Sequence, residues 1–209
     1  MFNFLNFGKK KREAEASRKW IFGTMLVFGI LGLTASFVLA IEEFHLLKNP
    51  DAILSCSFNL VLNCSTVMKT WQASVFGFPN MFIGLMGYPI VITVAVAGLS
   101  GMQFKRWFMV FANICYGLGA LFAYWLFFNS LYDIQVLCPW CLVVTFVTTI
   151  LFATITHHSL RENHFGFSKA RHEKVVAMLD KDVFKVVTAS WIVLMLALVF
   201  IKFGDSLFM

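Results

Sequence analysis

The sequence predicts an all-α integral membrane protein, in which four core membrane helices form a bundle and a fifth helix is added. Hydrophobic residues make up 59% of the 209 residues and charged residues only 13%, so water is unsuited as the main solvent of the folded chain. Five apolar runs also have the roughly 20 residues that a helix needs to cross a bilayer core about 30 Å thick. The expected spans are residues 20–40, 81–101, 107–129, 136–156 and 183–203.

The first span follows a basic tail over residues 1–19. A basic segment before an apolar run also begins a signal peptide, but this run is longer than the roughly 7 to 15 residues of a signal-peptide core. We therefore expect the run to remain as a membrane helix. The basic residues of the tail are Lys9, Lys10, Lys11, Arg12, Arg18 and Lys19.

The distribution of Lys and Arg predicts the orientation, because cytoplasmic loops are enriched in these residues. With the N-terminus in the cytoplasm, all of the 17 Lys and Arg residues except Lys48, Lys69 and Lys202 lie on the cytoplasmic side. The net charge of +6 could also suggest nucleic-acid binding. However, the excess flanks the membrane, where topology and anionic lipid explain it, so we expect no nucleic-acid partner.

This orientation divides the segments between the spans into outer and inner ones. The long outer loop, residues 41–80, mixes polar and apolar stretches, so we expect it to lie on the bilayer as short amphipathic helix and to form a lid. A short outer segment covers residues 130–137. The inner loop, residues 157–182, has mixed charges and a helix-like patch at 171–179, without recognisable chemistry. The fifth span and a short outer tail make up residues 183–209.

Two cysteines open the fourth span in the sequence Cys138-Pro139-Trp140-Cys141. Proline is tolerated in a first helical turn, because its missing N–H would have no intrahelical partner there. Residues three apart share a helix face, so a reversible disulfide is geometrically natural. The helix dipole favours a thiolate, while burial in an apolar environment opposes it. The motif therefore indicates a redox-active dithiol that caps a helix.

The other cysteines lie in the long outer loop and in the third span. Cys56 and Cys64 are expected in an exposed and mobile loop, where a disulfide would be accessible to the thiols of another protein. Cys115 lies near the middle of the third span, and we interpret it as a small buried hydrophobe. A structural loop disulfide with an incidental C-x-x-C, or a four-cysteine zinc site, are alternatives. Neither explains why one pair begins a membrane helix, so we expect no metal.

The two cysteine pairs, with this order of spans, resemble the vitamin K epoxide reductase family over about residues 20–156. The resemblance rests on two loop cysteines eight positions apart between the first two spans, followed by C-x-x-C at the start of the fourth. The fifth span, the short tail and the lack of a fused thioredoxin-like domain resemble stand-alone bacterial members. The resemblance therefore implies a separate DsbA-like thioredoxin-fold partner, a bacterial cytoplasmic (inner) membrane, and cysteines on its outer, periplasmic side.

The resemblance also implies a relay of two electrons, which supports disulfide bond formation. A reduced partner would attack the disulfide of the loop pair at Cys56, and the released Cys64 thiolate would attack Cys138. Cys141, one helical turn deeper, would then pass the electrons to a quinone in the membrane. The quinone could be a menaquinone, a ubiquinone or a vitamin K type.

Four further residues are candidates for the quinone site or for the sulfur chemistry. Asn80 matches the position of a quinone-contacting Asn in the family, with an N-cap as its alternative role, and Phe82 is a candidate aromatic wall. Thr145 stands where the animal enzymes have a Tyr near the quinone, and Thr70 is a candidate for an assisting hydroxyl. Ser57 departs from the acidic residue that follows the first loop cysteine in many bacterial members.

Three rival functions remain open from the sequence. A thiol-dependent reductase of vitamin K quinone or epoxide would use the same residues, but its purpose would be to produce the quinol. A membrane transporter would normally place ionisable or broken-helix sites in the middle of the membrane, and the five spans contain no such charges. In a membrane scaffold, the cysteines would form only a structural disulfide that holds a loop in place.

Overall fold

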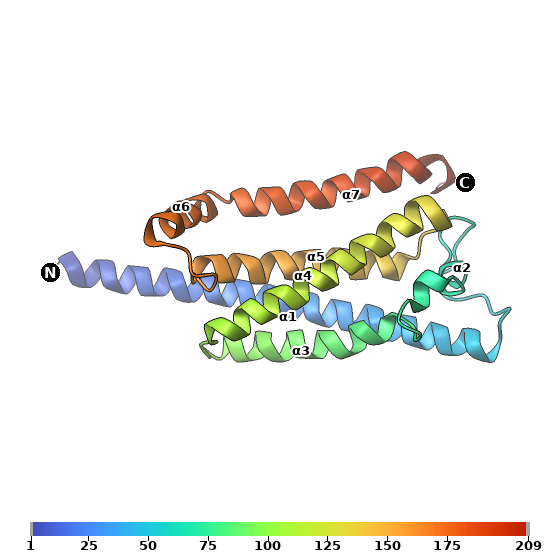
Figure 1. Cartoon of the computed structure of the whole chain (residues 1–209), viewed down its shortest axis with the longest axis horizontal. Helices are drawn as coiled ribbons and strands as arrows, with labels where there is room; N and C mark the ends of the chain where they lie inside the picture. Colours follow the sequence, from blue (N-terminus) through green and yellow to red (C-terminus); the bar gives the residue numbers. More distant parts are fainter. Residues whose placement is uncertain (1, 208–209) are drawn as a thin grey trace.

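A computed structural model describes the backbone of residues 2–207 and the side chains of residues 15–204. Nearly all of it is helical, and the described residues contain no β-strand. The side chains of Lys9 to Arg12, which contribute to the expected charge asymmetry, lie outside the described residues. The elements in Figure 1 are α1 (Phe2–Lys48), α2 (Cys64–Met68), η1 (Trp71–Ser74), α3 (Met81–Leu99), α4 (Arg106–Asn129), η2 (Ser130–Ile134), α5 (Pro139–Arg161), α6 (Lys169–Asp180) and α7 (Val183–Leu207).

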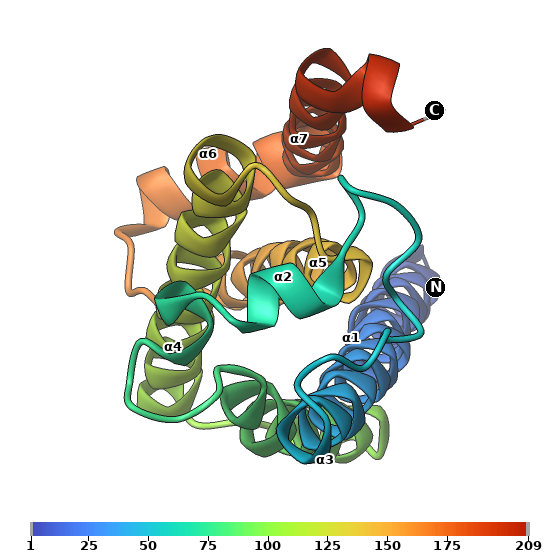
Figure 2. The same ribbon diagram turned by 90° about the vertical axis from the view of Figure 1, so that its right-hand side faces the viewer.

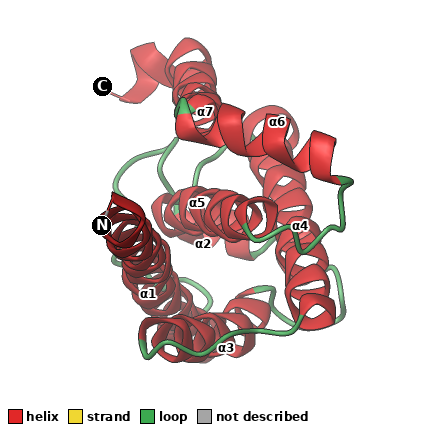
Figure 3. Ribbon diagram, turned by 90° about the vertical axis from the view of Figure 1, so that its left-hand side faces the viewer, coloured by secondary structure: helices red, strands yellow, loops and turns green. Residues whose placement is uncertain are grey.

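Among the residues that the structure describes, five helices are long and apolar enough to cross a membrane, which confirms the expected all-α membrane class. Helices suit this environment because they satisfy every backbone polar group within one segment. Figures 2 and 3 show α1, α3, α4 and α5 arranged as a ring, with α7 outside it on the side of α5. The five segments are Glu15–Lys48, Met81–Leu99, Arg106–Ile134, Pro139–Arg161 and Val183–Gly204.

The first helix extends further than its hydropathy predicts. The expected span ended at residue 40 and the outer loop began at residue 41, but α1 continues to Lys48, just before Pro50. Glu42 and Glu43 end the apolar run, yet nothing in residues 41–48 breaks a helix. A hydropathy pattern therefore locates where charge begins, and the helix stops only when proline restricts the backbone.

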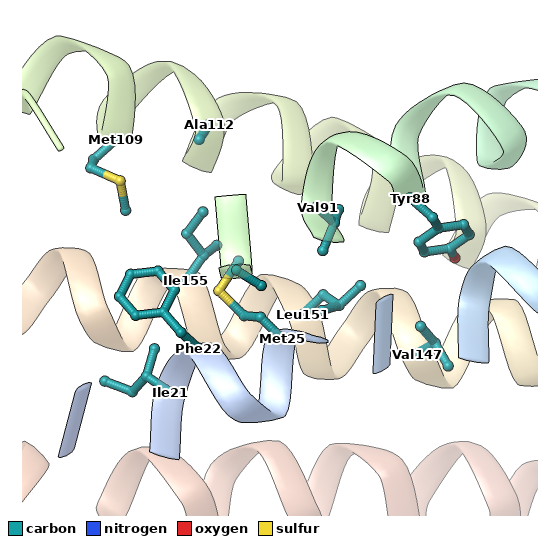
Figure 4. Close-up of a cluster of buried hydrophobic side chains, with 11 residues drawn as sticks. Ile21, Phe22, Met25, Tyr88, Val91, Met109, Ala112, Val147, Leu151 and Ile155 are labelled. Atoms are coloured by element: carbon teal, nitrogen blue, oxygen red, sulfur yellow. The ribbon is translucent and has the colours of Figure 1, made fainter. Parts of the chain in front are cut away.

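Glycines allow α1 and α3 to approach each other closely. A Cβ on Gly32 of α1 would overlap the ring of Tyr88 of α3, and a Cβ on Gly98 of α3 would overlap Phe22 of α1. Such small residues are typical of helix contacts in membranes, where close packing replaces the hydrophobic effect. Figure 4 shows the core that results, in which buried side chains from α1, α3, α4 and α5 meet.

The opposite side of the ring is less tightly packed. Helix α3 packs mainly against α1, and α4 packs mainly against α5, whereas the packing of α3 with α4 is slight. We call the boundary between α3 and α4 the α3/α4 seam. It separates two helix pairs that are each well packed, so it is the natural place for a cavity inside the ring.

Short helices close one end of the ring, which we call the cysteine end. There α1 and α4 end, α3 and α5 begin, and α2 lies across the opening in Figure 2. The expected short outer segment at 130–137 is mostly helical, because η2 prolongs α4 as one π-helical turn to Ile134. Gln135 then adopts a left-handed conformation with φ of 56°, which ends this helix and turns the chain toward α5.

Candidate functional site

The C-x-x-C cysteines occupy the first turn of α5, as their sequence predicts. Cys138 is the N-cap residue in an extended conformation, and Pro139 follows in the first turn. The Cys138 sulfur accepts a hydrogen bond from the backbone N–H of Cys141 at 3.4 Å. A helix N-terminus offers unpaired N–H groups to an acceptor, so local structure alone positions this sulfur.

Backbone pairing places the loop cysteines beside the first turn of α5. Leu62 and Leu137 form an isolated parallel β-bridge, in which Leu137 N–H donates to the carbonyl of Val61 at 2.7 Å. The N–H of Asn63 in turn donates to the carbonyl of Leu137 at 3.0 Å. Because Cys64 and Cys138 each follow a residue of this pairing, the bridge brings them together.

The side chain of Asn63 organises the loop around Cys64. Its Oδ1 accepts from the N–H of Thr66 at 3.2 Å and thereby caps α2, the helix that Cys64 begins. The same oxygen accepts from the hydroxyls of Ser57 at 2.9 Å and Ser65 at 2.8 Å. One amide oxygen therefore ties together the segments that follow Cys56 and Cys64.

Three sulfurs meet as a consequence. Cys56 and Cys64 form a disulfide with Cα atoms 5.7 Å apart. The Cys64 sulfur lies 3.3 Å from the Cys138 sulfur, while Cys138 and Cys141 are free thiols. Thiol–disulfide exchange requires an attacking sulfur in contact with a sulfur of the disulfide, and this contact provides such a pair.

The loop disulfide is buried, which contradicts the expectation of an exposed and accessible pair. Exposed fractions are 2% for Cys56, 0% for Cys64 and 1% for Cys138. The expectation rested on the polar residues of the loop. It missed that the last turns of α1 and the loop itself pack over the sulfurs with apolar side chains. This cover includes Leu39, Leu46, Leu54 and Val67.

A polar contact also holds the segment that carries Cys56. Glu42 is buried near the end of α1, and its carboxylate accepts a hydrogen bond from the hydroxyl of Ser55. Ser55 immediately precedes Cys56, so this bond fixes the loop against α1. A buried carboxylate that loses its partner is costly, and the contact therefore resists opening of the loop.

The electrostatics of the helix pair favour a thiolate at Cys138. A hydrogen bond from the Cys141 side chain lowers the pKa of the Cys138 thiol below its ordinary value. Burial raises the pKa but is outweighed, and the backbone N–H groups of Cys141 and Trp140 lower it further. The arrangement therefore makes Cys138 the more nucleophilic member of its pair, and hence suited to exchange with Cys64.

A cavity of about 410 Å³ lies inside the ring, directly below the sulfur cluster. Cys138 and Cys141 line its end, and apolar side chains of α3, α4 and α5 line most of the remainder. Ile90 and Phe111 also line it and are exposed on the surface of the bundle, so the cavity reaches the α3/α4 seam. An apolar ligand could therefore approach Cys141 from within the membrane.

The expected quinone-site residues fall in different places. Asn80, Thr145 and Thr70 line the cavity, whereas Phe82 is 45% exposed and is not among the lining residues. Phe82 faces away because it lies two positions after Asn80 at the start of α3, on a different helix face. Aromatic walls come instead from Tyr88 and from residues of α4. These α4 residues are Phe108, Phe111, Tyr116, Phe122 and Phe127.

Hydrogen bonds fix the polar members of this set. Asn80 does not cap α3 with its side chain, since its Nδ2 donates to the carbonyl of Gln72 at 2.7 Å. Its Oδ1 is buried and has no hydrogen-bond partner among the described residues. The hydroxyl of Thr145 donates to the carbonyl of Cys141 at 2.9 Å, and that of Thr70 to the carbonyl of Val67 at 2.7 Å.

Sequence reasoning missed the support behind Asn80. Gln72 is buried in η1, and its Nε2 donates to Asp133 of η2 at 2.6 Å. This chain of contacts links η2, η1 and the start of α3 at the cysteine end of the cavity. Gln72 and Asp133 are 61 positions apart, so no local pattern joins them. A polar residue between Trp71 and Ala73 was the only signal.

Cys115 differs from its sequence interpretation in one respect. It is exposed rather than buried, and it lines the cavity from α4. However, Asn113, two positions before Cys115, donates to the hydroxyl of Ser159 at 2.6 Å, and Ser159 lies near the end of α5 that is opposite the sulfur cluster. No contact joins it to another cysteine among the described residues.

Comparison with known proteins supplies the family. No curated protein matches the chain. Residues 24–156, well over half of the sequence, match the model of the vitamin K epoxide reductase family. Members of this family generally exchange electrons with a quinone and generally work with thioredoxin-like partners. The match includes both cysteine pairs and four of the five membrane helices. The chain is therefore a multi-pass membrane oxidoreductase acting on thiols, and it belongs to the vitamin K epoxide reductase family.

Proposed function

We propose that this protein oxidises the dithiol of a separate DsbA-like thioredoxin-fold protein and passes the two electrons to a membrane quinone, which supports disulfide bond formation. The observation that carries the proposal is the 3.3 Å contact between the Cys64 and Cys138 sulfurs. It joins a disulfide in the loop to a dithiol at the wall of an apolar cavity. Without that contact, the two pairs would be separate redox centres.

The proposed transfer begins at the loop. A partner thiolate attacks the Cys56 sulfur and breaks its bond to Cys64; the partner's second thiolate then displaces Cys56 from the mixed disulfide and completes the partner's disulfide. The Cys64 thiolate attacks Cys138 of the oxidised helix pair and displaces Cys141 as a thiolate. Cys56 next attacks Cys64 and displaces Cys138, which restores the loop disulfide and leaves two thiols in the helix pair. A loop disulfide beside free Cys138 and Cys141, as in the structure, is the arrangement that this product would have.

The buried state of Cys56 implies that the partner must displace part of the loop. The contact between Ser55 and Glu42 and the apolar cover over Cys56 hold the loop closed. We propose that docking of the partner opens this segment, whereas the β-bridge at Leu62 keeps Cys64 beside Cys138. Access to Cys56 is thereby separated from the internal exchange.

The cavity suits a quinone headgroup. Its walls are apolar, and the unpaired Oδ1 of Asn80 at the cysteine end is an acceptor for a hydroxyl of the quinol form, because its Nδ2 already donates to Gln72. We propose that Asn80 and the side chain of Thr145 border the headgroup beside Cys141, with the tail leaving through the α3/α4 seam. A bound quinone would accept two electrons and two protons from the helix pair. Phe82 lies outside this cavity and is not proposed as a contact.

We also propose that the cysteine end faces the outside of a bacterial cytoplasmic membrane. Near the opposite end lie Arg18, Lys105, Arg106, Arg161 and Lys169, whereas the cysteine end has few basic residues, such as Lys48 and Lys69. The positive-inside rule then assigns the opposite end to the cytoplasm. Because the loop pair is a disulfide, intact cells are first treated with a membrane-impermeant phosphine reductant and then with a membrane-impermeant maleimide. Labelling of the loop pair in intact cells is the expected result, and labelling only after lysis would contradict this orientation.

The decisive experiment is anaerobic reduction of decylubiquinone by the purified protein, supplied with a reduced DsbA-like protein. We expect one quinol for each partner disulfide formed. Cys141→Ala should abolish quinol formation, because the helix pair can no longer be oxidised as a pair. Cys115→Ala is the matched control, since it also removes a thiol that lines the cavity, and it should retain most of the activity. Equal loss in both variants would contradict the proposed relay.

A further inference from the structure

One hydroxyl deep in the cavity lacks a partner. Tyr116 lines the cavity from α4, and its hydroxyl is buried without a hydrogen-bond partner among the described residues. Two other tyrosines of the membrane helices have hydrogen-bond partners. The hydroxyl of Tyr88 pairs with Thr148 at 3.0 Å, and that of Tyr124 pairs with Thr149 at 3.0 Å. Tyr116 is therefore the exception among three similar residues.

Tyr116 lies at a different depth from the sulfur cluster. It packs against the core group that includes Tyr88 and Leu151. On α5, Leu151 follows Cys141 by ten residues, and a helix rises about 1.5 Å per residue, so the two levels differ by roughly 15 Å. One quinone ring cannot contact both Cys141 and a group at that level. A ligand of Tyr116 would therefore occupy a second position in the same cavity.

The chemistry of the group restricts what that ligand can be. A buried hydroxyl without a partner costs about 1–3 kcal/mol, so it calls for a specific explanation. The phenol has a proton to donate, while the surrounding walls are the apolar side chains of Phe108, Phe111 and Ile155. An apolar molecule with an accepting oxygen fits these surroundings. Exposed Phe111 and Ile90 show that this depth is reached from the lipid through the α3/α4 seam.

We propose that Tyr116 forms an inner subsite, where its hydroxyl donates a hydrogen bond to a carbonyl oxygen of a lipid-soluble quinone that has entered through the α3/α4 seam. The identity of the ligand rests on the proposed function, and the subsite itself rests on the unpaired hydroxyl and the cavity. The ring is held there, away from the sulfurs, before it moves to Cys141. No bond is made or broken at this subsite.

The test uses the full-length protein in lipid nanodiscs, oxidised and without dithiol, so that decylubiquinone stays in its quinone form. With isotopically labelled carbonyls, infrared difference spectra should show a band at lower wavenumber from the hydrogen-bonded carbonyl. Tyr116→Phe removes only the donor and should abolish that band. In turnover, this variant should raise the KM for decylubiquinone about three- to tenfold, as expected for one lost hydrogen bond, and leave the KM for the dithiol unchanged.

Tyr124→Phe is the matched control. It removes a hydroxyl from the same helix, but Tyr124 does not line the cavity and packs against Trp191 of α7. It should keep both the band and the KM of the unmodified protein. A band that survives Tyr116→Phe would overturn the subsite, even if the enzyme reduces quinone. A band that depends on Tyr116 in a protein without turnover would instead retain the subsite and reject the proposed function.

Discussion

The two cysteine pairs reach the same site by different means. Cys138 and Cys141 are three residues apart, and a single helix turn with proline in it determines their geometry. Cys56 and Cys64 depend on contacts between distant segments: the β-bridge of Leu62 with Leu137, and the packing of α1 over the loop. The helix pair is thus a local structure, whereas the loop pair is a tertiary one.

This difference separates two tasks that a sulfur relay requires. A helix turn is rigid, so Cys138 and Cys141 stay in place at the cavity wall for a ligand inside the bundle. A loop held by a few hydrogen bonds and apolar contacts can open locally without unfolding the helices. The contact between the Cys64 and Cys138 sulfurs is the point where the rigid and the openable parts meet.

The largest expected effect comes from trapping that contact. In a Cys56→Ala/Cys141→Ala/Cys115→Ala variant, only Cys64 and Cys138 remain, and mild oxidation should join them almost completely. The physical reason is their 3.3 Å separation, which requires little movement to form a bond. Mass spectrometry of the cross-linked peptides measures the yield.

The matched variant keeps the same number of cysteines but retains Cys56 and Cys138. It carries Cys64→Ala, Cys141→Ala and Cys115→Ala, and it should cross-link poorly, because no contact joins these two sulfurs in the described structure. Equal yields from the two variants would mean that the loop moves freely, and the contrast between a fixed and an openable pair would then be lost.

A smaller effect should follow when only the loop support is weakened. Asn63→Ala removes the cap of α2 and the contacts with Ser57 and Ser65. The loss of such a cap costs about 1–2 kcal/mol, so we expect roughly a tenfold slower formation of the Cys64–Cys138 cross-link in the trapping background. The rate is measured by quenching the oxidation with an alkylating reagent at set times and determining the fraction that is cross-linked.

Asn49→Ala provides the control for this variant. Asn49 begins the same loop, but its side chain contacts only the N–H of Asp51, at 3.3 Å, and it is exposed. Its cross-linking rate should match that of the unmodified loop. A similar slowing in both variants would indicate general loop destabilisation rather than a specific role of Asn63.

The smallest predicted effect concerns the acidity of Cys138 in the reduced protein. The Cys141 side chain lowers the Cys138 pKa by hydrogen bonding to its sulfur, so the thiolate persists to lower pH than in an ordinary cysteine. Cys141→Ala should therefore move the midpoint of Cys138 alkylation to higher pH and slow the reaction below that midpoint. The pH profile of iodoacetamide labelling, followed by mass spectrometry, measures the shift.

A change that leaves both cysteine pairs intact should keep that profile. Cys115→Ala removes a thiol that is absent from the causes of the Cys138 shift. A shift of the midpoint as large as that of Cys141→Ala would show that the hydrogen bond from Cys141 does not set the acidity of Cys138.

Several features followed from short stretches of sequence. The five spans, the capping of α5 by Cys138, and a helix near residues 171–179 each depend on neighbours within one or two turns. Other features depended on distant neighbours and were missed or wrong. The burial of Cys56 needs the end of α1, the support of Asn80 needs Gln72 and Asp133, and the outward position of Phe82 depends on which face of α3 the other helices cover.

The amino-acid sequence by itself determined that the chain is a helical membrane protein and that one dithiol begins a helix, because hydropathy, proline and i to i+3 spacing act locally. Only the tertiary structure decided which sulfur contacts which, that the loop disulfide is closed, and that a cavity reaches both Cys141 and Tyr116. Those properties arise from packing between helices far apart in the chain. The hydrophobic pattern of one segment does not determine which distant side chains pack against it.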